Sequence, residues 1–96
     1  MPSPLTARDR ARLKARAHAL EPVVQVGGAG LTDSLVAEVD RALTAHELIK
    51  VRIGGDDRAE RFAIGDDLCT RTGASPVHRV GKILILWRPR PETAGT

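Results

Sequence analysis

A four-residue glycine loop is the part of this sequence best suited to hold a phosphate. Gly27-Gly28-Ala29-Gly30 follows a short β-branched run at 22–26 and precedes an amphipathic segment that Thr32 is placed to cap. Glycines leave backbone N–H groups unobstructed, and a helix start adds the positive end of its dipole. The G-x-x-G tetrad therefore predicts contact with a nucleic-acid backbone, RNA in the first place. Glycine pairs also occur at strand–helix turns for steric reasons alone, so the tetrad needs support from the rest of the chain.

A run of cationic side chains near the N-terminus offers that support. Residues 8–16 hold five Arg or Lys side chains against one Asp, whereas the whole chain of 96 residues has a net charge of +3. The run forms two rows at helical spacing, with Arg8, Arg12 and Arg16 on one side and Arg10 and Lys14 on the opposite flank. Such a local patch on an otherwise balanced domain is typical of a polyanion binder, although a solvated helix face has the same composition.

Residues for catalysis or metal binding form no recognisable constellation. The three histidines are widely spaced and lack cysteine companions, which argues against a zinc site. Cys69 is the single cysteine, so no internal disulfide can form. Asp56-Asp57 and Asp66-Asp67 fall in an expected turn and an expected helix, where their carboxylates do not converge. No phosphate-loop or dinucleotide motif is present, and we expect no enzyme, no cofactor and no metal.

The elements that must position these residues can be read from hydrophobic periodicity and end signals. The sequence predicts helices over 6–18, 32–46 and 58–72 and strands over 22–26, 48–53, 77–80 and 82–88. The order α-β-α-β-α-β-β predicts a single-domain α/β (α+β) fold over residues 5–89, in which helices pack on a mixed four-stranded sheet. We expect two right-handed crossovers to place their strands in parallel and the final hairpin to add an antiparallel pair. Residues 90–96 are expected to form a flexible tail.

Two further cations lie on an expected strand, and their role depends on what covers the sheet. The strand at 48–53 alternates, so Lys50 and Arg52 face away from its apolar side chains. If that face is open they extend the basic surface, and if a helix covers it they merely snorkel. Phe62 and Trp87 are the two aromatic residues, with Phe62 on the apolar side of an expected helix and Trp87 expected at the core or its edge. Such a scarcity of aromatic faces favours recognition of an RNA backbone over base stacking.

Five ordered segments resemble the CRM domain (chloroplast RNA splicing and ribosome maturation), and most closely the single-domain bacterial YhbY-like proteins. The resemblance covers about residues 5–89. The segments are Leu13-Lys14-Ala15-Arg16-Ala17-His18 with Leu20 and Pro22, Gly27-Gly28-Ala29-Gly30-Leu31-Thr32, His46-Glu47-Leu48-Ile49-Lys50-Val51, Thr72-Gly73-Ala74, and Val80-Gly81-Lys82 with Leu86-Trp87-Arg88-Pro89.

This resemblance implies an RNA-binding module without catalytic residues, with a fold similar to the C-terminal domain of bacterial translation initiation factor three. It implies association with the rRNA of large ribosomal subunit precursors, with ribosomal proteins as further partners, through the tetrad and neighbouring basic residues. The sequence departs from the family where members commonly carry a basic or polar side chain within the loop, because Gly28 and Ala29 supply neither.

Composition limits the setting. The apolar runs are far shorter than a membrane span, and the N-terminus lacks the pattern of a signal peptide, so we expect a cytoplasmic protein that is monomeric or weakly associating. Two other functions stay open: a ribosome- or translation-associated module that binds mainly protein, and a small enzyme or accessory subunit acting on phosphorylated ligands. Steep salt dependence would separate RNA binding from the first of these.

Overall fold

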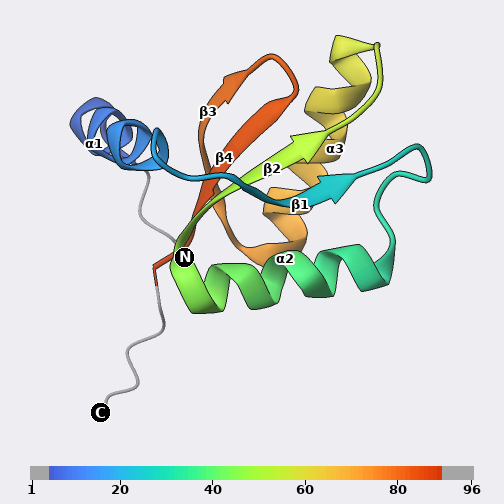
Figure 1. Ribbon diagram of the computed structural model, residues 1–96, viewed down its shortest axis with the longest axis horizontal. Helices are drawn as coiled ribbons and strands as arrows, with labels where there is room; N and C mark the ends of the chain where they lie inside the picture. Colours follow the sequence, from blue (N-terminus) through green and yellow to red (C-terminus); the bar gives the residue numbers. More distant parts are fainter. Residues whose placement is uncertain (1–4, 90–96) are drawn as a thin grey trace.

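The computed structural model describes residues 5–89, and its helices and strands follow the predicted order. They are α1 (Ala7–Ala17), β1 (Pro22–Val26), α2 (Asp33–His46), β2 (Leu48–Ile53), α3 (Arg58–Thr72), β3 (Ser75–Val80) and β4 (Ile83–Trp87) (Figure 1). The tail expected at 90–96 lies outside the described residues. The expected start of β3 is wrong by two residues, because Ser75 already pairs with Trp87. Pro76 fits there because β3 is an edge strand with a register shift between Pro76 and His78.

Local end signals account for the helix boundaries. Thr6 and Asp9 form a capping box at the start of α1, and the Thr32 side chain accepts a hydrogen bond from the Leu35 N–H at the start of α2. Gly73 ends α3 with a φ of 72°, a left-handed conformation that favours glycine. Each of these helix ends is therefore specified by residues that lie within one turn of it.

The four strands form one mixed sheet in the order β1-β2-β4-β3. β1 and β2 are parallel, as the first crossover predicts, and β4 is antiparallel to both β2 and β3. The last strand of the sheet is therefore inserted between β2 and β3. These two strands run in the same direction without touching, which keeps the second crossover compatible with the hairpin.

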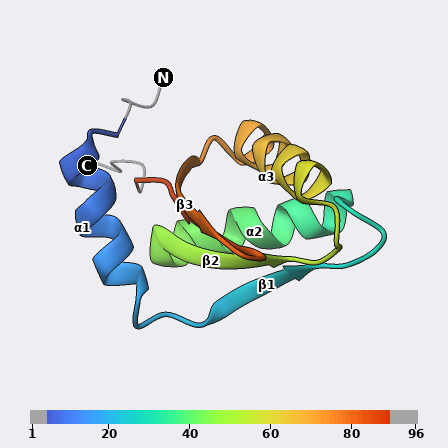
Figure 2. The same cartoon turned by 90° about the horizontal axis from the view of Figure 1, so that it is seen from above.

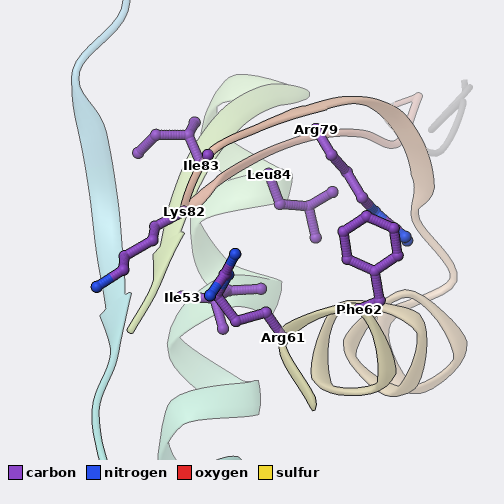
Figure 3. Close-up of a pocket in the computed structure, with 8 residues that line it drawn as sticks. Ile53, Arg61, Phe62, Arg79, Lys82, Ile83 and Leu84 are labelled. Carbon is purple, nitrogen blue, oxygen red and sulfur yellow. The ribbon is translucent and has the colours of Figure 1, made fainter. Parts of the chain in front are cut away.

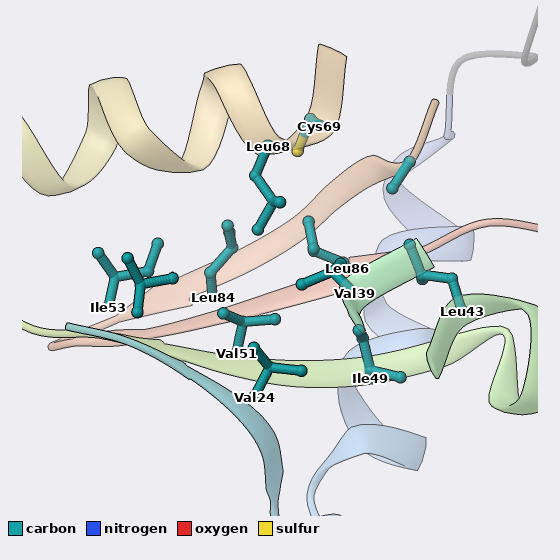
Figure 4. Close-up of a cluster of buried hydrophobic side chains, with 12 residues drawn as sticks. Val24, Val39, Leu43, Ile49, Val51, Ile53, Leu68, Cys69, Leu84 and Leu86 are labelled. Carbon is teal, nitrogen blue, oxygen red and sulfur yellow. The ribbon is translucent and has the colours of Figure 1, made fainter. Parts of the chain in front are cut away.

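Helices cover the two faces of this sheet unequally. α2 and α3 lie together on one face, whereas α1 lies apart from them, against one end of the other face (Figures 1 and 2). The larger cluster joins α2 and α3 to side chains such as Val51, Leu84 and Leu86 (Figure 4). The smaller one joins Leu13 of α1 to Ile85. β4 is thus buried on both sides, as its continuous apolar sequence predicts.

Within residues 5–89, none of the helices combines the length and the apolar character needed to cross a bilayer.

Candidate nucleic-acid interface

The glycine loop joins β1 to α2 as a tight turn at the edge of the sheet. The Gly30 N–H donates to the Gly27 carbonyl at 3.0 Å, and Gly30 has a φ of 74°. The turn itself therefore favours glycine at position 30. Gly27, Gly28 and Ala29 are exposed, and a Cβ built on Gly27 or Gly28 would meet nothing within 4 Å. These two glycines serve no packing need, and they leave a bare backbone facing solvent.

The start of α2 adds donors beside this loop. The Thr32 hydroxyl accepts from the Leu35 N–H at 3.1 Å, and the Thr32 carbonyl accepts from the Val36 N–H at 3.0 Å. Asp33 and Ser34 are the first two residues of α2. Their N–H groups belong to the first turn and have no acceptor within the helix. The Asp33 carboxylate lies nearby, exposed and 3.8 Å from an Arg71 nitrogen, so it offsets part of the positive potential.

The basic rows of α1 face solvent, as the spacing predicts. All five cations are exposed, while Leu13 and Ala17 are buried against the sheet. Two of the cations also have partners within the chain. The Arg12 guanidinium lies 3.6 Å from the Asp9 carboxylate, and Arg10 donates to the Leu5 carbonyl at 2.8 Å. Hydrogen bonds from the backbone and then the side chain of Thr6 hold the pKa of Asp9 below its ordinary value, so this carboxylate is charged at neutral pH.

The structure does not bring α1 and the glycine loop together. They lie at opposite ends of the molecule in both views, and its longest extent is 42 Å (Figures 1 and 2). α1 and the loop cannot contact the same phosphate, so a ligand that contacts both must extend along the molecule.

Lys50 and Arg52 take different positions between these ends. Lys50 is half-buried, and its Nζ donates to the Leu20 carbonyl at 3.0 Å, which ties the segment after α1 to the sheet. Arg52 is exposed and is opposite Gln25 of β1 in the parallel register. Arg52 therefore contributes to a basic surface, whereas Lys50 has a structural contact already.

A basic hollow beside α1 was not predicted from the sequence. It has a volume of about 320 Å³ and is lined by Lys14, His18, Lys50, His78, Val80, Ile83 and Ile85. From the sequence, the wide spacing of the histidines argued only against a zinc site. The proximity of His18 and His78 follows from the packing of α1 over the open face of the sheet, which no local pattern reveals.

A second cationic cluster, around Phe62, was also missed. The guanidinium carbons of Arg58 and Arg79 lie over the Phe62 ring, 5.2 and 4.6 Å from its centroid. Arg61 reaches into the same region from α3 (Figure 3). Phe62 is half-buried rather than a core residue, since this ring carries two cations. The R-x-x-R-F spacing at 58–62 was the available signal, and Arg79 could not be added to it from the sequence.

Trp87, the other aromatic residue, is half-buried and packs against the cluster beneath α1. Within residues 5–89, no three His, Cys, Asp or Glu side chains gather in a way that could hold a metal ion. The exposed cations of α1 and the amides of the glycine loop are the groups of this surface that suit an anionic polymer.

Comparison with known proteins agrees with this chemistry. A Haemophilus influenzae protein named as an RNA-binding protein is 43% identical over 88 residues, covering 92% of this chain and 89% of its own. A Pseudomonas aeruginosa protein named as a probable RNA-binding protein is 38% identical over 88 residues, covering 92% of this chain and 85% of its own.

The fold has a solved counterpart as well. The solution structure of SAV1595 from Staphylococcus aureus aligns with a TM-score of 0.81 over 94% of each chain, at 24% sequence identity. The CRS1/YhbY (CRM) domain matches residues 5–88, which is nearly the whole described structure. The chain belongs to the CRS1/YhbY (CRM) domain family.

Proposed function

We propose that this protein binds RNA through its sugar–phosphate backbone and assists assembly of the large ribosomal subunit, without catalysing a reaction. The glycine loop and the basic face of α1 are the proposed contacts, with Arg52 between them. The ribosomal part of the proposal is supported by the resemblance to stand-alone YhbY-like proteins, and the RNA part by the family and by the relatives named as RNA-binding.

The observation that carries the proposal is the bare glycine loop. Gly27 and Gly28 have neither the positive φ nor the close neighbours that would make glycine necessary for the fold. A backbone without side chains at an exposed turn is suited to close approach by a phosphate. The amides at the start of α2 supply donors for such a phosphate oxygen.

The separation of the two contact regions favours a ligand of some length. α1 and the loop lie at opposite ends of a molecule whose longest extent is 42 Å. A structured rRNA segment that lies along the open side of the sheet can reach both, with Arg52 in between. Each neutralised phosphate releases counterions, so binding should weaken steeply as salt rises.

Sedimentation of a tagged copy in a cell lysate tests the proposal. At low salt, we expect co-migration with free large subunits or their precursors and absence from translating ribosomes, and raised salt should release the protein. A protein that stays at the top of the gradient under both conditions refutes the ribosomal part. Association that survives raised salt favours binding to ribosomal protein instead.

Two variants test the contacts directly, in binding assays with large-subunit rRNA fragments. Gly28→Asp places a carboxylate at the open loop position and should weaken binding, while the neutral Gly28→Asn separates charge from bulk. Arg12→Glu reverses one charge of the α1 row. Arg41→Glu makes the same change on the exposed side of α2 and serves as the control. Unchanged binding in both Gly28→Asp and Arg12→Glu would refute the proposed contacts.

A further inference from the structure

We infer that the cationic cluster around Phe62 is a second phosphate-binding site for the RNA backbone, which acts together with the glycine loop. The inference rests on the proposed RNA-binding function and assigns to it residues outside the loop and α1. The site is a hollow of about 260 Å³ lined by Arg58, Arg61, Phe62, Arg79 and Gly81. It lies between the start of α3 and the turn that joins β3 to β4.

The charge of this cluster is only partly compensated. The Arg79 guanidinium donates to the Asp66 carboxylate. Among residues 5–89, this Asp66–Arg79 contact is the one ion pair made by any of the three arginines, and Arg58 and Arg61 have none. Asp57 lies close in sequence but caps α3, since its carboxylate accepts from the Ala59 and Glu60 amides. The hollow therefore keeps an excess of positive charge that an anion can neutralise.

The aromatic ring holds these cations rather than a base. The guanidinium carbons of Arg58 and Arg79 lie 5.2 and 4.6 Å from the Phe62 centroid, within range of cation–π attraction. A guanidinium held in this way loses less side-chain freedom when it binds, and its N–H fork matches a phosphate. Because cations already engage the ring, the ligand chemistry that fits is a phosphodiester and not a stacked nucleobase.

Arg61 shows that the arrangement has a cost in stability. Its Nη1 donates to the Gly55 carbonyl at 2.8 Å, but its Nε is buried without a hydrogen-bond partner in the described chain. A buried donor left unpaired is unfavourable, and an apolar side chain of similar length would avoid that cost. Local arrangements that weaken the fold are expected where a protein binds a ligand.

The position of the cluster places it beside the glycine loop. The start of α3 and the loop lie at the same end of the molecule in both views (Figures 1 and 2). The Gly54 N–H donates to the Val26 carbonyl at 3.0 Å, directly before the loop, and Arg61 holds the adjoining Gly55. One RNA strand that crosses the Gly54-Gly55 segment can thus contact the loop amides with one phosphate and the arginines with another.

Charge reversal at Arg58 tests the inference. Arg58→Glu removes one contact from an exposed position, and Arg41→Glu is the matched control on α2. With a labelled rRNA hairpin that has a 5′-hydroxyl end, we expect Arg58→Glu to weaken binding about tenfold or more. The slope of log affinity against log salt should fall by about one. If Arg58→Glu binds as Arg41→Glu does, the inference is wrong and the proposed function stands. If the wild-type protein binds no rRNA, both are wrong.

Arg61→Met provides a readout that a structural role would not give. We expect this variant to unfold at the same or a higher urea concentration than wild type, because the buried Nε is gone, and yet to bind the hairpin more weakly. Lower stability with unchanged affinity would overturn the inference. Inorganic pyrophosphate at matched ionic strength is the competitor that separates the sources of phosphate. Weak competition supports an RNA backbone site, and tight displacement would assign the hollow to a small phosphorylated ligand instead.

Discussion

Arg88, directly after β4, should be important for the stability of the fold. Its side chain is 18% exposed, and its guanidinium links the end of β4 to two helices. Nη1 donates to the Asp40 carboxylate at 2.6 Å and to the Thr72 carbonyl at 2.7 Å, while Nη2 donates to the Asp40 carbonyl at 3.0 Å and the Thr44 hydroxyl at 2.9 Å. Asp40 and Thr44 belong to α2, and Thr72 is the last residue of α3. Arg88 therefore holds the two helices to the sheet.

The magnitude follows from which partners can return to water. The Asp40 side chain is 55% exposed, so its ion pair is worth about 0–1 kcal/mol. Thr72 is 7% exposed, and its carbonyl loses a charged donor at a helix end, at a cost of about 1–3 kcal/mol. Arg88→Ala should therefore lower the free energy of unfolding by about 3 kcal/mol. That is a large share of the roughly 5–15 kcal/mol typical of a domain.

Urea unfolding monitored by circular dichroism measures this loss. Arg88→Lys should recover less than half of it, since one ammonium cannot reproduce the planar fork that reaches both helices. The exposed Arg41→Ala is the control and should change stability by about 0.5 kcal/mol at most. The reasoning is refuted if Arg88→Ala falls within 1 kcal/mol, roughly, of that control, or if Arg88→Lys is as stable as wild type.

Three smaller predictions concern the loop, α1 and the core. Gly30→Ala should cost about 1 kcal/mol or more in urea unfolding because of its φ of 74°, whereas Gly28→Ala should be nearly neutral; equal losses would contradict the assigned turn. The stability advantage of wild type over Asp9→Asn should be fully present above the ordinary carboxyl pKa of 3.8 and disappear as pH falls through the lowered pKa of the folded state. A pH-independent difference in urea midpoints would argue against the capping box. Burial raises the pKa of the Cys69 thiol to about 11, so a thiol reagent at pH 8 should react only as fast as the domain opens, and rapid labelling of native protein would contradict that burial.

Local signals explain why most of the fold could be predicted from the sequence. Thr6, Thr32 and Gly73 each act within one helical turn, and the alternation of β2 assigns its faces directly. Strand neighbours were harder, because a β-α-β pattern predicts parallel direction without saying whether another strand lies between. The long apolar run of β4 indicated burial on both sides, and only the structure shows it between β2 and β3.

The cluster around Phe62 could not be predicted because it depends on a single register shift. Regular alternation from the Pro76–Leu86 pair would place Arg79 opposite Ile83, on the face that α1 partly covers. The shift between Pro76 and His78 places Arg79 opposite Leu84 instead, on the face covered by α3. A slip of one residue exchanges the faces of a strand, and bulges have no reliable sequence signal. The glycine loop, in contrast, is contiguous and was visible at once.

The insertion of β4 between two earlier strands has a consequence for how the nascent chain acquires its structure. Until residues 83–87 have been synthesised, β2 and β3 have no partner on their facing edges, and the apolar side chains of the larger cluster lack Leu84 and Leu86. Such unpaired edges invite aggregation or proteolysis. The four-stranded sheet therefore closes only once β4 is complete. The last strand to be synthesised is thus the one that joins the two halves of the sheet.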